Sequence, residues 1–134
     1  MKTMPLLISL FSFISLNAYA VDQDYLNQLK YKIAGINLKL PKKIDDITTM
    51  EEMRIIKLED GFYVATMAKI DSNIQSFGNN REIVRENTIK IGCNDAATLG
   101  YMKNGMKIGI LYKNSSGKIF DQITFQIAKL LCFF

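Results

Sequence analysis

The sequence predicts a single α+β domain stabilised by one disulfide. Two pairs of strand-like runs each flank a turn signal, Asp60-Gly61 in the first pair and residues 114–117 in the second. Helix-like runs precede the first pair and separate it from the second, and turn signals of this kind close antiparallel hairpins. We therefore expect a four-stranded antiparallel sheet made of two β-hairpins, with an N-terminal helix and two consecutive central helices on one face.

The first 20 residues have the features of a signal peptide rather than of a folded element. Lys2 gives a basic start, Leu6 to Leu16 is an apolar run interrupted only by serines, and Ala18-Tyr19-Ala20 has the small-x-small pattern of a cleavage site. Cleavage after Ala20 would leave one domain, residues 21–134, that is periplasmic or secreted and has no transmembrane segment. An uncleaved N-terminal anchor helix is the alternative, although a membrane span needs about 20 apolar residues.

The predicted domain begins with a helix over Asp22 to Ala34. Asp22 or Asp24 can cap its start, and Gly35 is expected to end it. Residues 36–40 alternate between apolar and polar, which indicates a short extended piece before Pro41. Residues 42–50 are interpreted as a connecting loop. The apolar positions of the helix recur at helical spacing on one face, at Tyr25, Leu26, Leu29 and Ile33.

The first hairpin is the clearest element of the sequence. Residues 53–58 and 62–70 are rich in β-branched and aromatic residues, and Glu59-Asp60-Gly61 between them favours a tight turn. The second of these strands is apolar on both faces, because Phe62, Val64, Thr66 and Ala68 alternate with Tyr63, Ala65, Met67 and Lys69. This pattern predicts that the strand lies in the middle of the sheet.

Two helices and a second hairpin are predicted to follow. Asn79 or Asn80 can cap the first helix, which Gly92 would end, and Asn94 or Asp95 can cap the second, Ala96 to Lys103. The first would bury a face formed by Ile83, Val84, Thr88 and Ile91, and the second would present Leu99 and Met102. The last two strands, Met106 to Lys113 and Lys118 to about Ala128, would present alternate apolar residues to the core.

The two cysteines, Cys93 and Cys132, are expected to form the disulfide. Exported proteins meet an oxidising environment, where two thiols usually pair, and two cysteines allow only one connectivity. The bond would fasten a helix end to the chain terminus, stabilising the fold by roughly 3–4 kcal/mol on the chain-entropy account. A pair of free buried thiols is the alternative. The apolar tail that ends in Phe133-Phe134 is interpreted as a cover for the core edge, with docking to a partner as the alternative.

The composition excludes several kinds of chemistry. The chain has no histidine, so Ser-His-Asp and Cys-His catalysis and the commonest zinc sites are excluded. No CxxC pair, nucleophile motif, glycine-rich phosphate loop or calcium loop occurs. The net charge is +4 but acids and bases are mixed, which argues against nucleic-acid binding. We therefore predict no catalytic, cofactor-binding or metal residue and no cofactor.

Three pairs of neighbouring acids remain as candidates for carboxylate chemistry. They are Asp45-Asp46, Glu51-Glu52 and Glu59-Asp60. A glycosidase-type mechanism needs two acids about 5–10 Å apart across a cleft, whereas neighbours in sequence usually point in different directions. The turn explains Glu59-Asp60, and solvated loops explain the other two pairs.

The layout resembles that of an unnamed group of small exported bacterial proteins of unknown function. The shared features are an LP..ID..T motif at Leu40-Pro41, Ile44-Asp45 and Thr48, a helix ending in cysteine, a YxxxxG hairpin from Tyr112 to Gly117, and a final cysteine. The resemblance implies export, this fold and the disulfide, and it transfers no catalytic residue.

The sequence is compatible with two functions. The first is a non-enzymatic exported binding protein, such as an inhibitor, an immunity protein or an envelope accessory protein, with a protein partner in the cell envelope. The second is a small envelope hydrolase that uses carboxylates, which would require two acids to converge in one cleft.

Overall fold

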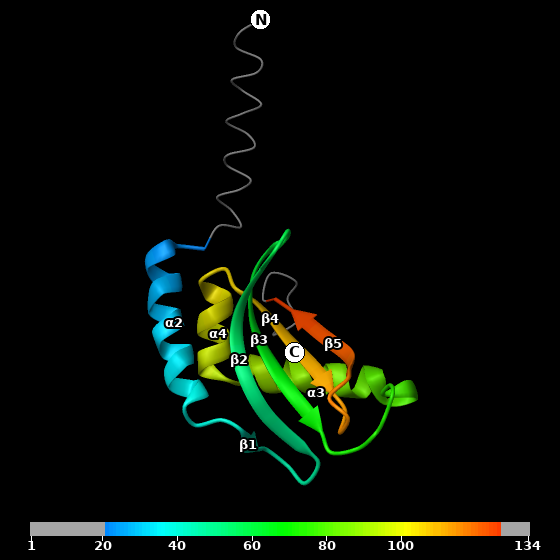
Figure 1. Ribbon diagram of the computed structural model, residues 1–134. Helices are drawn as coiled ribbons and strands as arrows, with labels where there is room; N and C mark the ends of the chain where they lie inside the picture. Colours follow the sequence, from blue (N-terminus) through cyan, green and yellow to red (C-terminus); the bar gives the residue numbers. More distant parts are fainter. Residues whose placement is uncertain (1–20, 127–134) are drawn as a thin grey trace, which may run out of the picture.

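The computed structural model describes residues 21–126, which form one sheet with helices on one of its faces (Figure 1). The predicted signal peptide with its cleavage site after Ala20, Cys132 and the tail Phe133-Phe134 lie outside the described residues. Along the chain the elements are α2 (Gln23–Asn37), β1 (Lys42–Lys43), β2 (Thr48–Leu58), β3 (Gly61–Ile70), η1 (Gly78–Asn80), α3 (Arg81–Cys93), α4 (Ala96–Lys103), β4 (Lys107–Lys113) and β5 (Ile119–Phe125).

The sheet corrects the predicted topology. It has five strands in the order β1-β2-β3-β4-β5, and β3 and β4 run parallel while the other neighbours are antiparallel. Both hairpins exist, but the prediction of a purely antiparallel four-stranded sheet was wrong. Two helices connect β3 to β4, and a connection of that length can carry the chain back to the end of the sheet where β3 began. Tyr63 therefore pairs with Lys107, near the starts of both strands.

The segment before the first hairpin also differs from its prediction. Residues 36 and 37 continue α2 instead of forming an extended piece, and residues 42–43 pair with Thr49 and Met50 as the short edge strand β1. The Asp45 carboxylate accepts hydrogen bonds from the backbone N–H groups of Ile47 (2.9 Å) and Thr48 (2.7 Å), which closes the β1–β2 turn. The β2 strand thus starts at Thr48, five residues before the predicted position.

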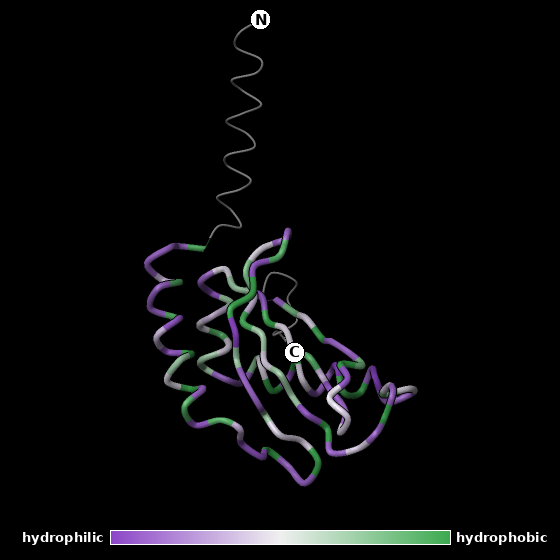
Figure 2. Tube along the Cα trace, in the orientation of Figure 1, coloured by the Kyte–Doolittle hydropathy of each residue, from purple (hydrophilic) through white to green (hydrophobic). Residues whose placement is uncertain are grey.

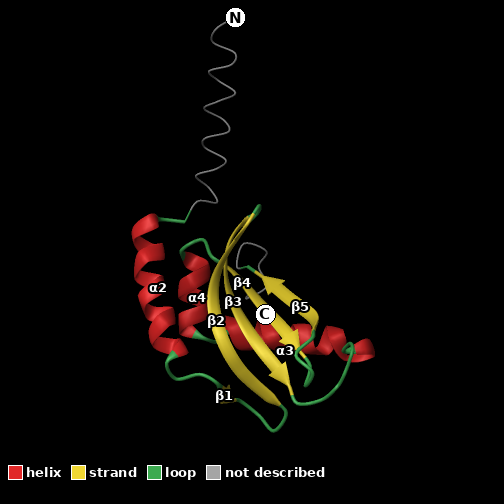
Figure 3. Ribbon diagram, viewed as in Figure 1, coloured by secondary structure: helices red, strands yellow, loops and turns green. Residues whose placement is uncertain are grey.

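The helices lie on one face of the sheet, with α3 crossing behind the strands in Figure 3. Along α2, hydrophilic and hydrophobic residues alternate with the helix turns (Figure 2), and the predicted core positions Leu26, Leu29 and Ile33 are buried. The sequence places α4 correctly, since Asp95 caps it by accepting the N–H of Thr98 (3.0 Å), and Met102 is buried.

Helix α3 presents only part of its predicted face to the core. Val84 packs against the core and Thr88 contacts the buried Tyr112, as predicted. Ile83 and Ile91, however, are 57% and 72% exposed, and Ile89 and Gly92 are buried instead. Gly92 does not end the helix, which continues through Cys93. Cys93 itself packs against the core, while its predicted partner Cys132 lies outside the described residues, so their disulfide stays a prediction.

The core consists of two separate hydrophobic clusters beneath the sheet. The larger one joins α2, α4 and the first half of β4, around Leu29 and Met106. The smaller one, around Ile123, holds Tyr112 in edge contact with Phe77, with ring centroids 5.0 Å apart. Residues of both clusters line one common hollow between the sheet and the helices.

Candidate functional site

Two of the predicted acids line a common hollow, but each of them is paired with a cation. Glu51 and Glu52 both line a hollow of about 420 Å³. Glu51 forms an ion pair with Lys113, and Glu52 with Arg54 at 2.8 Å. Asp45 belongs to the β1–β2 turn, where the N–H of Ile47 is the main cause of its lowered pKa. Among residues 21–126 no group of three or more cysteine and acidic side chains is placed to hold a metal ion. The two acids that share a hollow are therefore each engaged by a cation.

Asp60, at the turn between β2 and β3, belongs to a group of polar side chains that hydrogen-bond to one another. Its carboxylate accepts hydrogen bonds from the Tyr63 hydroxyl at 2.7 Å and from the Lys107 ammonium at 2.9 Å. The tyrosine bond, followed by the lysine bond, lowers the pKa of Asp60. Burial, and then the same carboxylate, raises the pKa of Tyr63 to about 12. A phenol so resistant to ionisation is no general base near neutral pH, so this cluster joins β3 to β4 rather than performing catalysis.

A large hollow in the described part of the protein lies between α2 and α4, which stand side by side in Figure 1. We call it the helix groove, and its volume is about 920 Å³. Its lining is mostly apolar and comes from α2, α4, the segment between α2 and β2, and the start of β2: Tyr25, Lys32, Gly35, Ile36, Lys39, Leu40, Lys42, Ile44, Met50, Ala96, Ala97, Gly100, Tyr101 and Asn104.

The helix groove is open because α4 carries small residues on that side. Ala96 and Ala97 are exposed, and a Cβ atom added at Gly100 would meet nothing within 4 Å. The two tyrosines of the groove lie close together, and burial followed by the neighbouring Tyr101 raises the pKa of Tyr25. The groove thus has an apolar, partly aromatic lining.

The charges that line the helix groove are all positive. Lys32 comes from α2, Lys39 follows α2, and Lys42 belongs to β1, while no acidic residue contributes to the described lining. Apolar surface next to several cationic groups favours a ligand that is both apolar and acidic. The groove therefore has a chemical preference as well as a shape.

A second hollow, which we call the sheet slot, lies between the helix-covered face of the sheet and helices α3 and α4. Its volume is about 410 Å³. It separates the two core clusters, since Ile108 and Phe125 belong to one cluster and Ala68 and Tyr112 to the other. Ile44 and Met50 line both the sheet slot and the helix groove, so the two hollows share one wall.

Sequence reasoning missed both hollows. No sequence pattern singled out Lys39 or Lys42 as part of a site, and residues 42–50 were interpreted as a connecting loop. One signal did point here: Leu40 and Ile44 of the LP..ID..T motif line the helix groove, and Thr48 lines the sheet slot. The motif therefore marks a segment that lines both hollows, although its pattern by itself reveals no ligand.

No protein-family model matches the sequence, and a search of curated proteins found no significant match. Solved structures do match its fold. A proposed secreted protein of Pseudomonas aeruginosa aligns with a TM-score of 0.64 at 10% identity, over 79% of this chain and 90% of that one. The pilotin EpsS of the Vibrio vulnificus type 2 secretion system gives 0.55 at 16%, over 76% and 86%.

A further similar structure is the pilotin AspS of the Vibrio cholerae type II secretion system, with a TM-score of 0.53 at 11% identity over 72% of this chain and 83% of that one. At such identities the likeness concerns the fold alone. Among residues 21–126, no helix is long and apolar enough to cross a membrane. The chain thus has an α+β fold with a five-stranded mixed sheet that it shares with two pilotins and a proposed secreted protein.

Proposed function

We propose that this protein is an exported, non-enzymatic accessory protein of the cell envelope that holds a segment of a partner protein in the helix groove. The observation that carries the proposal is the groove itself, with an apolar lining between two helices and three lysines on its walls. An amphipathic segment that presents apolar side chains and acidic residues matches this surface in both respects. The alternative of a carboxylate hydrolase has less support, because Glu51 and Glu52, which line one hollow, are each paired with a cation.

The structural likeness supports the same proposal at a coarser level. Two proteins with this fold are pilotins of type II secretion systems, and a third is a proposed secreted protein. A protein of the secretion machinery in the envelope is therefore the first partner to test.

Site-specific photo-crosslinking in cells tests the proposal directly. A photoreactive residue at Ala97, which is exposed and lines the helix groove, should capture a defined envelope protein. The matched control is Asn87, which is exposed on α3 outside the groove. Gly100→Trp should fill the groove without disturbing α4, because nothing lies within 4 Å of a Cβ at that position, and it should abolish the Ala97 crosslink.

With the purified partner, the contribution of charge to its affinity for the helix groove can be measured. Reversing Lys39 and Lys42 to glutamate should weaken its binding, and added salt should weaken the binding of the unmodified protein because exposed charges are screened. Equal crosslinking from Ala97 and Asn87, or a crosslink that survives Gly100→Trp, would show that the helix groove is not the binding surface.

A further inference from the structure

Several polar groups of the sheet slot bond to one another. The Thr88 and Tyr112 hydroxyls are 3.1 Å apart, and the Asp95 carboxylate accepts both the N–H (3.0 Å) and the hydroxyl (2.6 Å) of Thr98. Thr48 and Thr66 are the other polar residues of the described lining, and the remaining side chains are apolar.

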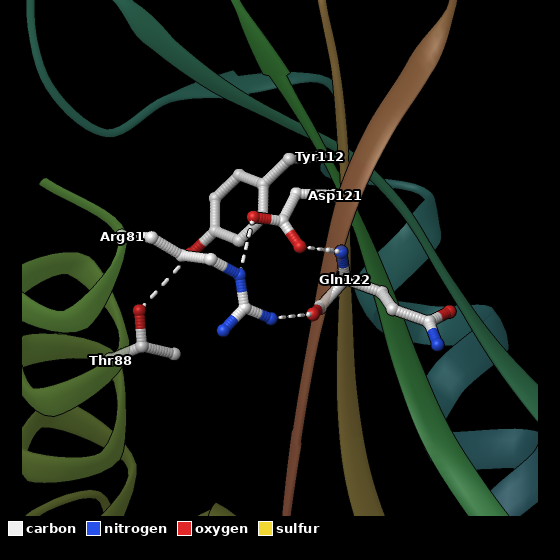
Figure 4. A network of polar contacts seen from close by, with 5 residues as sticks. All are labelled: Arg81, Thr88, Tyr112, Asp121 and Gln122. Atoms are coloured by element: carbon white, nitrogen blue, oxygen red, sulfur yellow. Dashed lines mark hydrogen bonds and ion pairs between the residues drawn. The ribbon is translucent and has the colours of Figure 1, made fainter. Parts of the chain in front are cut away.

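Helix α3, which contributes to the slot lining, contacts β5 near both of its ends. At the first end the Arg81 guanidinium contacts the Asp121 carboxylate at 2.9 Å and the Gln122 carbonyl oxygen at 3.2 Å (Figure 4). At the other end Gly92 lies directly against the ring of Phe125. Between these points the Thr88–Tyr112 contact joins α3 to β4. These contacts position α3 relative to β4 and β5.

Exposed apolar side chains accompany the slot. Ile91 and Ile44, both in its lining, are 72% and 54% exposed. Part of the slot lining is therefore exposed apolar surface. Its volume of about 410 Å³ falls in the range of roughly 300–1,000 Å³ that is usual for small-ligand sites.

The described lining of the slot holds one charged residue, Asp95, which is engaged with Thr98. Cationic groups lie in the adjoining helix groove, where Lys42 pairs with Met50 of the shared wall across β1 and β2, and Lys39 is also in the lining. A negatively charged group at the Met50 wall would lie near these lysines, whereas the same group beside Asp95 would be repelled.

We propose that the sheet slot binds the hydrocarbon chain of an anionic single-chain amphiphile. The chain occupies the slot between the two clusters, and the acidic head group lies at the shared wall near Lys42. This inference does not depend on the proposed function, because it concerns a different hollow and a different class of ligand.

Isothermal titration calorimetry of the purified chain 21–134 with dodecanoate, below its micelle concentration, tests the inference. Saturable binding is expected. Ala68→Leu places a larger side chain in the slot and should weaken binding by about tenfold or more, since it removes room for the chain. The matched control is Ala65→Leu, on the same strand and equally buried (6% against 5% exposed) but not in the slot lining, which should have little effect.

Two further measurements keep the test decisive if Ala68→Leu does not fold. Lys42→Gln, at an exposed position, should weaken dodecanoate binding by about threefold, as expected for an exposed charge pair. Dodecyltrimethylammonium, which has the same chain and the opposite charge, should bind more weakly than dodecanoate. Gly100→Trp fills the helix groove from α4 and should abolish the Ala97 crosslink, whereas dodecanoate binding should remain saturable, which separates this inference from the proposed function.

Each contrary result overturns the proposal. Absence of saturable binding to the full mature chain would show that the slot does not accept the amphiphile. Unchanged affinity in a folded Ala68→Leu protein would place the ligand elsewhere. Equal affinity for the cationic amphiphile, or no effect of Lys42→Gln, would remove the role assigned to the lysines.

Discussion

At the scale of single residues, Gly92 shows most clearly how packing decides a position that the sequence leaves ambiguous. A glycine near a helix end is usually a stop signal, and the sequence predicts one here. In the structure α3 passes through Gly92, and a Cβ atom there would lie 2.6 Å from Cζ of Phe125 and 3.0 Å from Cε2. The missing side chain is therefore needed for helix–strand contact, not for helix termination.

Gly92→Ala should lower the free energy of unfolding by about 1–3 kcal/mol, the usual cost of overpacking a core. The Phe125 ring is buried, so it can move aside only by disturbing its neighbours. Urea denaturation of the mature chain measures the effect. Gly35→Ala in α2 is the control, because it meets nothing within 4 Å and should be neutral or stabilising. Equal stability of the two variants would contradict this account.

Tyr63 gives a prediction about pH. Burial is the larger cause of its high pKa of about 12, and the hydrogen bond to Asp60 adds to it. Because the folded-state pKa lies above the ordinary value of 10.0, this tyrosine contributes stability that is complete below pH 10 and is lost as the pH rises toward 12.

Asp60→Asn should therefore lower the pKa of Tyr63 without returning it to 10.0, since burial remains. An alkaline NMR titration of the labelled tyrosine rings measures both values. Tyr101 serves as the internal control, because its raised pKa depends on burial and Asp95 rather than on Asp60. A Tyr63 pKa that does not change in Asp60→Asn would contradict the assigned hydrogen bond.

At the scale of elements, the parallel pairing of β3 with β4 decides the architecture. Each hairpin was correctly predicted from its own turn, because turn chemistry is local. The direction in which two hairpins meet depends on where α3 and α4 return the chain, which no residue of either hairpin encodes. The path of the chain through α3 and α4 also leaves the sheet slot between these two helices and the sheet.

Amide hydrogen exchange should rank the strands by their place in the sheet. The amides of β3 and β4 should exchange most slowly, because each strand has neighbours on both sides and supplies buried residues to the core. The two-residue edge strand β1 should exchange fastest. Slower exchange in β5 than in β3, measured residue by residue by NMR, would not fit this sheet order.

At the scale of the whole molecule, export is the condition for a role in the cell envelope. The basic start, the apolar run and the small-x-small site are local sequence features, and they lie outside the described residues. Mass spectrometry of the protein recovered from the periplasm or medium should give a mature chain that starts at Val21. A mass that includes Met1 would show that the leader is retained and would support the anchor alternative.

The sequence by itself determined the α+β class, both hairpins, the three helices of the described chain and most of the core positions. These features follow from periodicity, caps and turns, which act over a few residues. The exposed side of α3 was misjudged, because its apolar residues fit more than one face and packing against β5 selects Ile89 over Ile91.

Only the tertiary structure decided the mixed sheet, the edge strand β1 and the two hollows. Lys39 and Lys42 look like ordinary surface lysines along the chain, and they line one groove because α2, α4 and β1 bring them together. The sheet slot likewise is lined by strands and helices that are far apart in the sequence. Hollows arise from the distances between elements, and those distances depend on long-range packing that local sequence patterns do not record.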